Sequence, residues 1–407
     1  MSGPQPQPSP DAPTTVELGP IPDGAPELPL ARARTAIAAL LEAPPPWLEL
    51  EAGIVDPQRM GQVPRGPTLV LGLGGSALGT RAVLAFAEVA GLAPARVEVL
   101  DAVDPRVVRP ILDWAAGAQA KVMVVSKSAR TVEVLALLEA CVARGLEVAT
   151  LISDPVDSAE AEAEAAPVRA RIRASSPDCV ELSIPPAVGG RWSVFTAVAQ
   201  APLWAAMLDP RLLVDGAIAA RDRMRADPGA ASSLASSLAW RWANPGPISI
   251  LWCYSEILIH LAAWVQQLEC ESLGRLREDG SRVGELVCPL RGPADQHSVA
   301  QLLLHGPQHG RVSFLDFDGP SAAELEAHGT DPLIALTRLR IIEREATRES
   351  MTLPTRQLLI RDPGPATLGA VMLEHMFETA IAAEALGVSP YGQPAVELIK
   401  QGIYARM

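Results

Sequence analysis

Two glutamates near the end of one predicted helix are candidates for proton transfer. Glu269 and Glu271 lie in the sequence QLECESLGR, and the helical pattern that precedes them is otherwise apolar. A carboxylate near the C-terminus of a helix meets the negative end of the helix dipole, so at least one of the two needs another reason to be there. General-base catalysis is one such reason, and a solvent-exposed helix end explains the pair equally well from these residues alone.

Three further side chains could transfer a proton or stabilise a charge. His297 follows the loop RGPADQ and begins a helical stretch, where it could shuttle protons near neutral pH, although a histidine at such a position is more often structural. Arg191 follows two glycines and could hold an anion close to the backbone, or form a surface salt bridge. Lys400 lies on the last predicted helix, where a solvated lysine is the ordinary interpretation.

A glycine-rich turn offers a first place for an anion. The sequence TLVLGLGGSALG, at Thr68–Gly79, ends an apolar run in glycines and then opens a helical pattern, so that helix N–H groups face the turn. Gly72–Ala77 has the spacing G-x-G-x-x-A, and the next apolar run ends at Asp101. Together they fit a dinucleotide-binding turn with its ribose-binding acid, and a tight turn without a ligand remains open.

A second turn, SKSARTVEV at Ser126–Val134, favours a phosphate more strongly. Ser126, Ser128 and Thr131 place three hydroxyls next to the start of a predicted helix. Several short hydrogen bonds near a helix N-terminus suit a phosphate monoester. An ordinary helix cap needs only one hydroxyl, so three within six residues indicate a phosphate site.

Short apolar runs alternate with helical patterns along most of the chain, which predicts mostly parallel sheets covered on both faces. A break at PAVGGR and two helical regions, Phe195–Ala226 and Ala230–Trp242, divide this alternation into two α/β halves. The predicted strands are Thr68–Leu73, Val97–Asp101, Val122–Ser126, Glu147–Ile152 and Val180–Ile184 in the first half, and Ile248–Trp252, Gly284–Cys288, Val312–Phe317 and Gln357–Ile360 in the second.

These patterns set the expected domain boundaries. Residues 1–30 are rich in proline and have no apolar periodicity, which predicts a disordered or polyproline-like tail. The first α/β domain is expected over 31–215, a helical connection over 216–245, and the second α/β domain over 246–386. A C-terminal helix within 387–407, begun by Pro394, carries Lys400.

Composition and charge exclude several classes of function. The 407-residue chain has a net charge of −13 and no long basic run, which argues against nucleic acid and anionic membranes as partners. Five cysteines without CxxC spacing predict a reduced, cytoplasmic protein without a zinc site. The N-terminus lacks the pattern of a secretory leader. Ile248–Leu268 contains polar residues and is predicted to be a strand followed by an amphipathic helix.

Taken together, the motifs resemble those of the phosphoglucose isomerase family. The matching segments occur in the family's order across Gly72–Lys400. They are LGLGGSALG (71–79), SKS-x-x-T-x-E (126–133), GGRWSV (189–194), QLECESLGR (267–275), ADQHSVAQLLLHG (294–306) and QPAVELIK (393–400).

The resemblance implies two sugar-isomerase (SIS-type) doubly wound α/β domains with a C-terminal helical arm. It also implies reversible conversion of glucose 6-phosphate to fructose 6-phosphate through an enediolate, in glycolysis and gluconeogenesis. The expected enzyme uses no cofactor and no metal, binds a small sugar phosphate, and is a homodimer with shared active sites.

The resemblance also assigns residues to roles. It makes Glu271 the base that moves a proton between C1 and C2, and His297 the ring-opening histidine, which in the family reaches the site from the partner subunit. Lys400 matches the lysine near the ring oxygen, and Arg191 the arginine that stabilises the enediolate. The expected substrate and phosphate contacts are Gly75, Ser76, Ser126, Lys127, Ser128, Thr131, Gln267 and Gln393.

Four positions depart from the family pattern and bear on the substrate. Arg130 and Val134 replace residues that usually carry hydroxyls, Ala129 replaces a glycine, and Arg275 replaces a lysine. A lost hydrogen bond to a charged phosphate would cost about 1.5–3 kcal/mol, which Arg130 could offset by pointing inward. Three alternatives therefore remain open: a non-catalytic sugar-phosphate-binding protein, an isomerase of another sugar phosphate such as mannose 6-phosphate, and an NAD(P)-dependent dehydrogenase that uses Gly72–Ala77.

Overall fold

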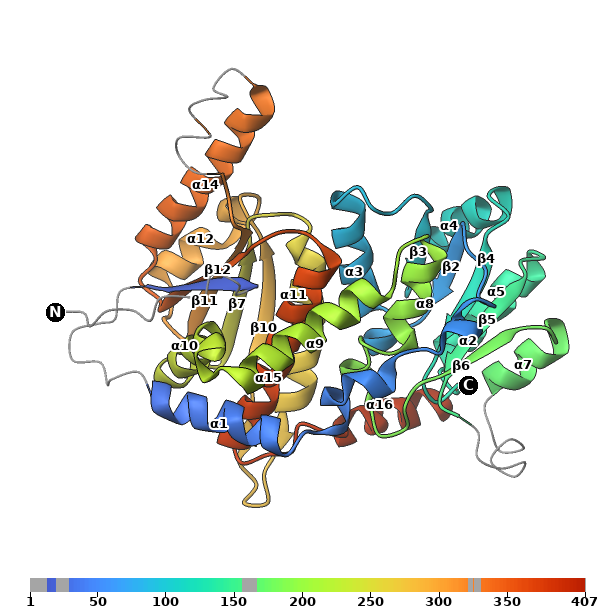
Figure 1. Ribbon diagram of the computed structural model, residues 1–407, viewed down its shortest axis with the longest axis horizontal. Helices are drawn as coiled ribbons and strands as arrows, with labels where there is room; N and C mark the ends of the chain where they lie inside the picture. The colour runs from blue at the N-terminus through green and yellow to red at the C-terminus, as the bar shows by residue number, and fades with distance from the viewer. Residues whose placement is uncertain (1–12, 20–28, 156–166, 321–324, 326–330, 407) are drawn as a thin grey trace. The chain divides into compact units, whose positions relative to one another are not determined.

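The computed structural model describes residues 13–19, 29–155, 167–320, 325 and 331–406 of the chain (Figure 1). Contacts divide the chain into two compact units. We call Pro44–Asp222 with Pro363–Met372 the first unit, and Met1–Ala43, Arg223–Asp362 and Leu373–Met407 the second unit. Each unit contains a five-stranded sheet with helices, which confirms the predicted α/β class.

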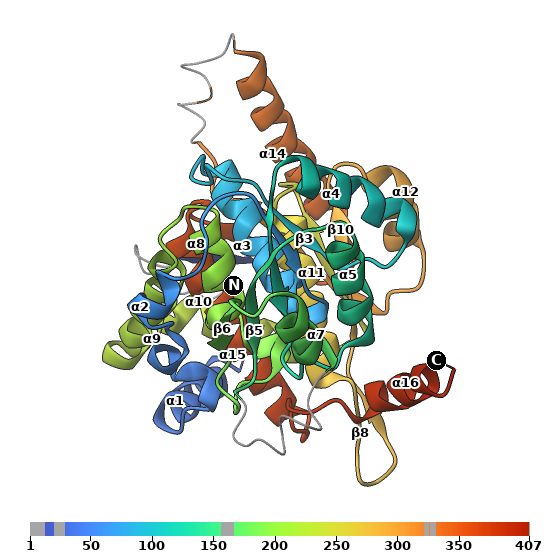
Figure 2. The ribbon, with the colours of Figure 1, turned by 90° about the vertical axis from the view of Figure 1, so that its right-hand side faces the viewer.

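The sheet of the first unit is parallel throughout, with the strand order β3-β2-β4-β5-β6. Alternate strand residues enter two separate cores: Leu69 and Leu71 pack on one face and Val70 on the other. Helices α4, α5 and α7 cover the first face, and α8 covers the second (Figure 2). The bounds are β2 (Thr68–Leu71), α3 (Leu78–Val89), β3 (Val97–Leu100), α4 (Pro105–Gly117), β4 (Lys121–Val125), α5 (Val132–Ala143), β5 (Val148–Ser153), α7 (Pro167–Ser175), β6 (Val180–Ser183), α8 (Ala197–Ala205) and α9 (Arg211–Ala226).

The sheet of the second unit has the order β1-β12-β11-β7-β10, in which only the β1–β12 pair is antiparallel among the described strands. Pro289 is tolerated because β10 is an edge strand. The bounds are β1 (Thr14–Leu18), α1 (Leu30–Glu42), α10 (Ser232–Ala243), β7 (Ile248–Cys253), α11 (Leu258–Leu273), β8 (Arg275–Leu276), β9 (Arg282–Val283), β10 (Leu286–Arg291), α12 (Gln296–His305), β11 (Gly310–Phe317), α14 (Pro332–Ser350), β12 (Thr355–Ile360), α15 (Pro365–Ala385) and α16 (Pro394–Tyr404).

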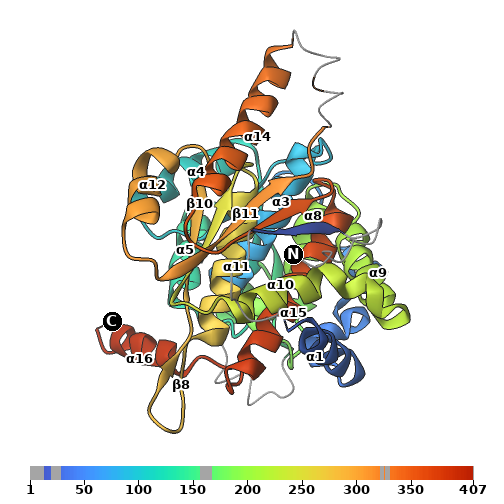
Figure 3. The same ribbon diagram turned by 90° about the vertical axis from the view of Figure 1, so that its left-hand side faces the viewer.

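The strand β1 corrects the prediction of a disordered tail over residues 1–30. The strand Thr14–Leu18 lies beside β12 at the edge of the sheet (Figure 3). The two strands pair antiparallel, with Thr14 opposite Ile360 and Leu18 opposite Arg356. The edge of a sheet presents unpaired N–H and C=O groups, and the short β-type sequence TTVEL satisfies those of β12. The proline-rich residues 1–12 and 20–28 lie outside the described residues.

The compact units differ from the sequence-based domain boundaries at both ends. Residues 31–43 were expected in the first domain, but α1 packs on α10 in the second unit, where the Arg32 guanidinium lies 4.6 Å from the ring centroid of Trp242. Conversely, the start of α15 belongs to the first unit. Gly369 allows this packing, because a Cβ there would lie 2.0 Å from the carbonyl oxygen of Leu213 on α9.

The helical region predicted at Phe195–Ala226 is two helices, and the predicted strand at Gly284–Cys288 starts later. Helix α8 ends at Ala205, and α9 begins at Arg211 after Pro210, which interrupts the helical hydrogen bonds. The apolar stretch Ile248–Leu268 forms β7 and most of α11, as expected.

Within the described residues, no helix is both long enough and apolar enough to cross a membrane.

Candidate active site

The loop after β4 brings the predicted hydroxyls to the start of α5. Ser126 is buried, and its Oγ lies 3.2 Å from Oγ1 of Thr131, the residue that immediately precedes α5. Ser128 is exposed, and its Oγ accepts a hydrogen bond of 3.4 Å from the backbone N–H of Arg130. The loop therefore has hydroxyls beside unpaired helix N–H groups, which is an arrangement that can bind a phosphate.

Two of the departures in this loop have structural explanations. Val134 is 1% exposed and packs in the core of the first unit, so its missing hydroxyl removes no contact at the loop surface. Ala129 has φ of 49°, in the left-handed region that favours glycine. Its N–H is hydrogen-bonded to the carbonyl of Ser126, and its methyl group is buried, so the loop keeps the conformation that glycine would adopt.

The two cations of the loop are placed differently. Lys127 Nζ lies 2.6 Å from Oδ1 of Asp154 and 3.2 Å from the carbonyl oxygen of Pro186. Arg130 is exposed. The carboxylate of Asp154 thus holds the ammonium group of Lys127, a partner that the sequence did not reveal because it lies at the end of another strand.

Gly75 has a role in packing that joins two predicted site segments. A Cβ at Gly75 would lie 2.4 Å from the carbonyl carbon of Gly190 and 2.7 Å from the backbone nitrogen of Arg191. Only glycine permits this approach. The turn Gly74–Ser76 therefore lies directly against the turn Gly189–Arg191. The Trp192 ring stacks on Trp47 at 5.0 Å, which further fixes the turn that carries the buried Arg191.

Asp101, the acid required by the dinucleotide interpretation, is already paired. Its Oδ1 lies 2.7 Å from Nη2 of Arg81 on α3, which also donates to the carbonyl of Val99. The carboxylate therefore links α3 to the end of β3, and no observation favours a dinucleotide at this turn.

In the second unit, α11 separates the two candidate carboxylates. Glu269 is 3% exposed and forms an ion pair of 2.8 Å with Arg241, so it does not lie at a solvent-exposed helix end. Glu271 is half-buried, and its Oε2 accepts a hydrogen bond of 3.1 Å from Nε2 of Gln267, one turn earlier. The two carboxylates therefore lie in different surroundings, and the role of Glu271 in proton transfer stays a prediction.

Arg275 connects the end of α11 to the segment before α16. Its guanidinium donates to the carbonyl oxygens of Glu271 at 2.8 Å, Ser389 at 3.0 Å and Gly392 at 2.9 Å. Gln393 follows directly, so one side chain links the turn of Glu271 to the predicted substrate contact. The sequence showed Arg275 only as a replacement of a lysine.

The contacts described for His297 and Lys400 within the second unit do not bear on their assigned roles. His297 lies on the first turn of α12, and its exposed imidazole makes no hydrogen bond or ion pair with any residue that the structure describes. Lys400 on α16 is exposed and pairs with Glu397 at 2.7 Å. Their roles remain predictions. In the described parts of the chain, no three His, Cys, Asp or Glu residues are grouped as a metal site would require.

Comparisons with known proteins identify relatives of this chain. The family model of phosphoglucose isomerase matches residues 66–324. A glucose-6-phosphate isomerase of Thermus thermophilus is 31% identical over 353 residues, which cover 82% of this chain and 81% of that protein. A glucose-6-phosphate isomerase of Rubrobacter xylanophilus is 30% identical over 405 residues, which cover 92% of each chain.

A solved structure has a similar fold over nearly the whole chain. A hypothetical protein of Thermus thermophilus is 27% identical and has a TM-score of 0.74, with 93% of this chain and 94% of that chain covered. The matched family model spans more than half of this chain and includes both the SKSART loop and the end of α11. The chain therefore belongs to the phosphoglucose isomerase family.

Proposed function

We propose that this enzyme interconverts glucose 6-phosphate and fructose 6-phosphate by proton transfer between C1 and C2. Relatives named glucose-6-phosphate isomerase, about 30% identical over most of the chain, support the reaction. The observation that carries the mechanism is the Gln267–Glu271 hydrogen bond on α11, beside a Glu269 whose charge is compensated by Arg241. This arrangement leaves one carboxylate oriented for general-base catalysis.

Glu271 removes the proton from one carbon and returns it to the neighbouring carbon. The hydrogen bond from Gln267 orients the carboxylate before the substrate arrives, which reduces the reorganisation required in the transition state. Negative charge develops on oxygen in the enediolate, and the guanidinium of Arg191 stabilises it more in the transition state than in the substrate. Ser126, Ser128 and Thr131 bind the phosphate at the start of α5.

The assay is direct. The purified protein receives fructose 6-phosphate, and glucose 6-phosphate formation is followed. We expect Glu271→Gln to lower kcat by about 10²–10⁴ while sugar-phosphate binding and the melting temperature stay near the wild-type values. Glu278→Gln is the matched control, because Glu278 is an exposed glutamate on the following hairpin. Absence of turnover in the folded wild-type enzyme would overturn the proposed reaction.

The enzyme acts as a homodimer in this proposal. Leu333, Leu336, Leu339 and Ile342 form an exposed apolar row along α14, each at least 49% exposed. Leu398 and Ile399 on α16 are also exposed. Such rows are typical of surfaces that a partner covers, and a second copy is the partner that the family resemblance implies.

Mixing two inactive variants tests whether the dimer shares its sites. If His297 acts on the partner's substrate, dimers of one Glu271→Gln chain and one His297→Ala chain contain one complete site. Random mixing then restores about a quarter of the wild-type activity, since half of the dimers are mixed and each has one of two sites intact. A sedimentation mass equal to that of one 43.0 kDa chain would contradict the dimer.

The same proposal places the enzyme in the cytoplasm. Cys141, Cys179, Cys253, Cys270 and Cys288 are free thiols, which persist in reducing compartments. Burial raises the pKa of the Cys141 thiol to about 12, so this side chain stays protonated. Alkylation of the denatured protein straight after cell lysis, without reductant, should label every cysteine, and recovery of disulfide-linked peptides would contradict this location.

A further inference from the structure

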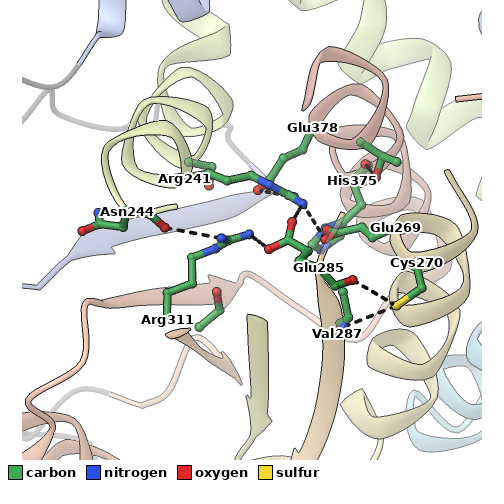
Figure 4. Close-up of polar contacts among 12 residues, drawn as sticks. Arg241, Asn244, Glu269, Cys270, Glu285, Val287, Arg311, His375 and Glu378 are labelled. Atoms are coloured by element: carbon green, nitrogen blue, oxygen red, sulfur yellow. Dashed lines mark hydrogen bonds and ion pairs between the residues drawn. The ribbon is translucent and has the colours of Figure 1, made fainter. Parts of the chain in front are cut away.

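A buried cluster of charged side chains includes Glu269, which lies near the end of α11. It consists of the arginines 241, 311 and 356 and the glutamates 269, 285 and 378, whose side chains are between 2% and 8% exposed. The arginines come from α10, β11 and β12. Two of the glutamates come from α11 and α15, and Glu285 lies just before β10 (Figure 4).

Arg241 is at the centre of the cluster. Its Nη2 contacts Oε2 of Glu269 at 2.8 Å and also contacts Glu285, and its Nη1 lies 3.3 Å from Oε1 of Glu378. The outer arginines complete the network, since Arg311 contacts the second oxygen of Glu285 and Arg356 contacts Glu378 at 3.0 Å. Each carboxylate thus has an arginine partner, as buried ions require.

The charges in this cluster are balanced. Three guanidinium groups and three carboxylates sum to zero, counted over the described residues. Burial by itself raises the pKa of Glu378, but the guanidinium groups of Arg356 and Arg241 outweigh it and hold this pKa at about 2. Glu378 is therefore charged at neutral pH, and its loss would leave a buried positive charge. At Glu269, burial raises the pKa and the charge of Arg241 opposes this shift.

Further contacts hold the same part of α11 against β10. Nε2 of Gln266 donates to the carbonyl of Val287 at 2.7 Å, and the N–H of Val287 donates to Sγ of Cys270 at 3.3 Å. Gln266, Glu269 and Cys270 therefore face the cluster and β10. Gln267 and Glu271 form their own hydrogen bond one position further around the helix.

We propose that Glu269 is a positioning residue for the isomerase reaction. Its ion pair with Arg241 fixes the rotation of the last turn of α11, and with it the carboxylate of Glu271 and the amide of Gln267. An ion pair between a carboxylate and a guanidinium is directional, whereas apolar packing alone is not. This inference rests on the proposed function, in which Glu271 is the base.

The matched pair Glu269→Gln and Glu378→Gln tests the inference. Each substitution keeps the shape of the side chain and removes one carboxylate charge from Arg241, but Glu378 lies on α15 and not on α11. Both variants should lose stability. We expect only Glu269→Gln to lower kcat, by about 10- to 100-fold, as small displacements of a catalytic group do, with KM for fructose 6-phosphate close to the wild-type value.

Rates are measured on folded protein, well below the melting temperature of the weaker variant. An equal loss of kcat in both variants would show that the cluster only stabilises the fold, and an unchanged kcat in Glu269→Gln would equally overturn the inference. If Glu269→Gln does not fold, Glu269→Asp decides, because it keeps the charge and shortens the side chain. A lower kcat supports the positioning role, and a wild-type kcat overturns it.

The Glu271→Gln variant separates this inference from the proposed function. If Glu271→Gln is inactive and the two cluster variants behave alike, only the role of Glu269 fails. If Glu271→Gln keeps the wild-type kcat, the assignment of the base fails, whatever the cluster variants do.

Discussion

The SKSART loop and the end of α11 are both assigned to the proposed reaction but are held in different ways. In the loop, the hydroxyls are held by neighbours in the chain, since Ser126 contacts Thr131 and Ser128 accepts from the backbone of Arg130, whereas Lys127 pairs with Asp154, 27 positions away. The end of α11 is held by Arg241, Glu285 and Arg275, whose partners lie from 4 to 117 positions away along the chain. A short motif therefore describes the hydroxyls of the loop better than it describes the partners that hold the end of α11.

Substitution of Arg191 is expected to have the largest effect among these tests. Arg191 belongs to the first unit, as the SKSART loop does, but its assigned role is to stabilise the enediolate. We expect Arg191→Gln to lower kcat by about 10²–10³, as the loss of one preorganised donor to an oxyanion does, with a smaller change in KM. Steady-state kinetics on fructose 6-phosphate measure both. Arg144→Gln, an exposed arginine paired with Asp113, is the control. A raised KM with normal kcat would make the first unit a binding unit only.

The pH dependence of the free energy of unfolding tests the buried charges around Glu378, Arg356 and Arg241. Burial lowers the pKa of the His375 imidazole from 6.5 to about 4. The negative charge of Glu378 opposes this shift, and the positive charges of Arg356 and Arg241 add to it. The unfolded chain then binds a proton at pH 5 that the folded chain does not, so stability falls as the pH drops from 6.5 towards 4. At pH 5 the loss is about 2 kcal/mol, from about 1.5 pH units at about 1.4 kcal/mol each.

His375→Gln isolates this effect, since glutamine does not titrate and all other groups are shared. Urea unfolding of both proteins at pH 7 and pH 5 gives the four free energies of unfolding. We expect the wild type to lose about 2 kcal/mol relative to the variant over this interval. Parallel losses in the two proteins would mean that His375 takes up its proton in the folded state as readily as in the unfolded chain.

Arg275 tests whether the long-range attachment of α11 depends on arginine geometry. A lysine carries the charge but lacks the planar group that reaches several carbonyls at once. We expect Arg275→Lys to lower kcat/KM about tenfold, which corresponds to about 1.4 kcal/mol. The control is Arg277→Lys, because Arg277 bonds to the carbonyl of Leu386 and not to Glu271 or Gly392. Similar effects of the two variants would contradict a specific role for Arg275.

The smallest expected effect concerns Asp154. Among the contacts described above, it is the one residue outside the SKSART loop that forms an ion pair with the loop. Its carboxylate offsets the charge of Lys127. Asp154→Asn should lower KM for the sugar phosphate about threefold, as expected for a partly exposed ion pair worth about 0.7 kcal/mol. Titration with inorganic phosphate as an inhibitor gives a second reading. A raised KM would show instead that Asp154 orients Lys127 for binding.

Much of the fold and part of the site could be predicted from local patterns. The alternation of apolar runs and helical segments depends on which residues each strand and helix buries, and it placed the parallel strands of both sheets. The hydroxyls of Ser126 and Thr131 were predicted together because the residues that form the loop are neighbours in the chain. The pairing of Thr14–Leu18 with β12 was missed, since nothing in five residues indicates which edge will accept them.

The sequence by itself determined that a turn with three hydroxyls precedes a helix, that Arg191 follows two glycines, and that two carboxylates lie near the end of one helix. The family resemblance assigned the base to Glu271, and only the tertiary structure showed how differently the two carboxylates are held. Burial and pairing with Arg241 commit Glu269 to the interior, while Gln267 orients Glu271. It likewise placed Val134 in the core and made Arg275 a link to Gly392. The reason is that the free energy of a buried charge depends on its partners, and those partners come from strands and helices far apart in the sequence.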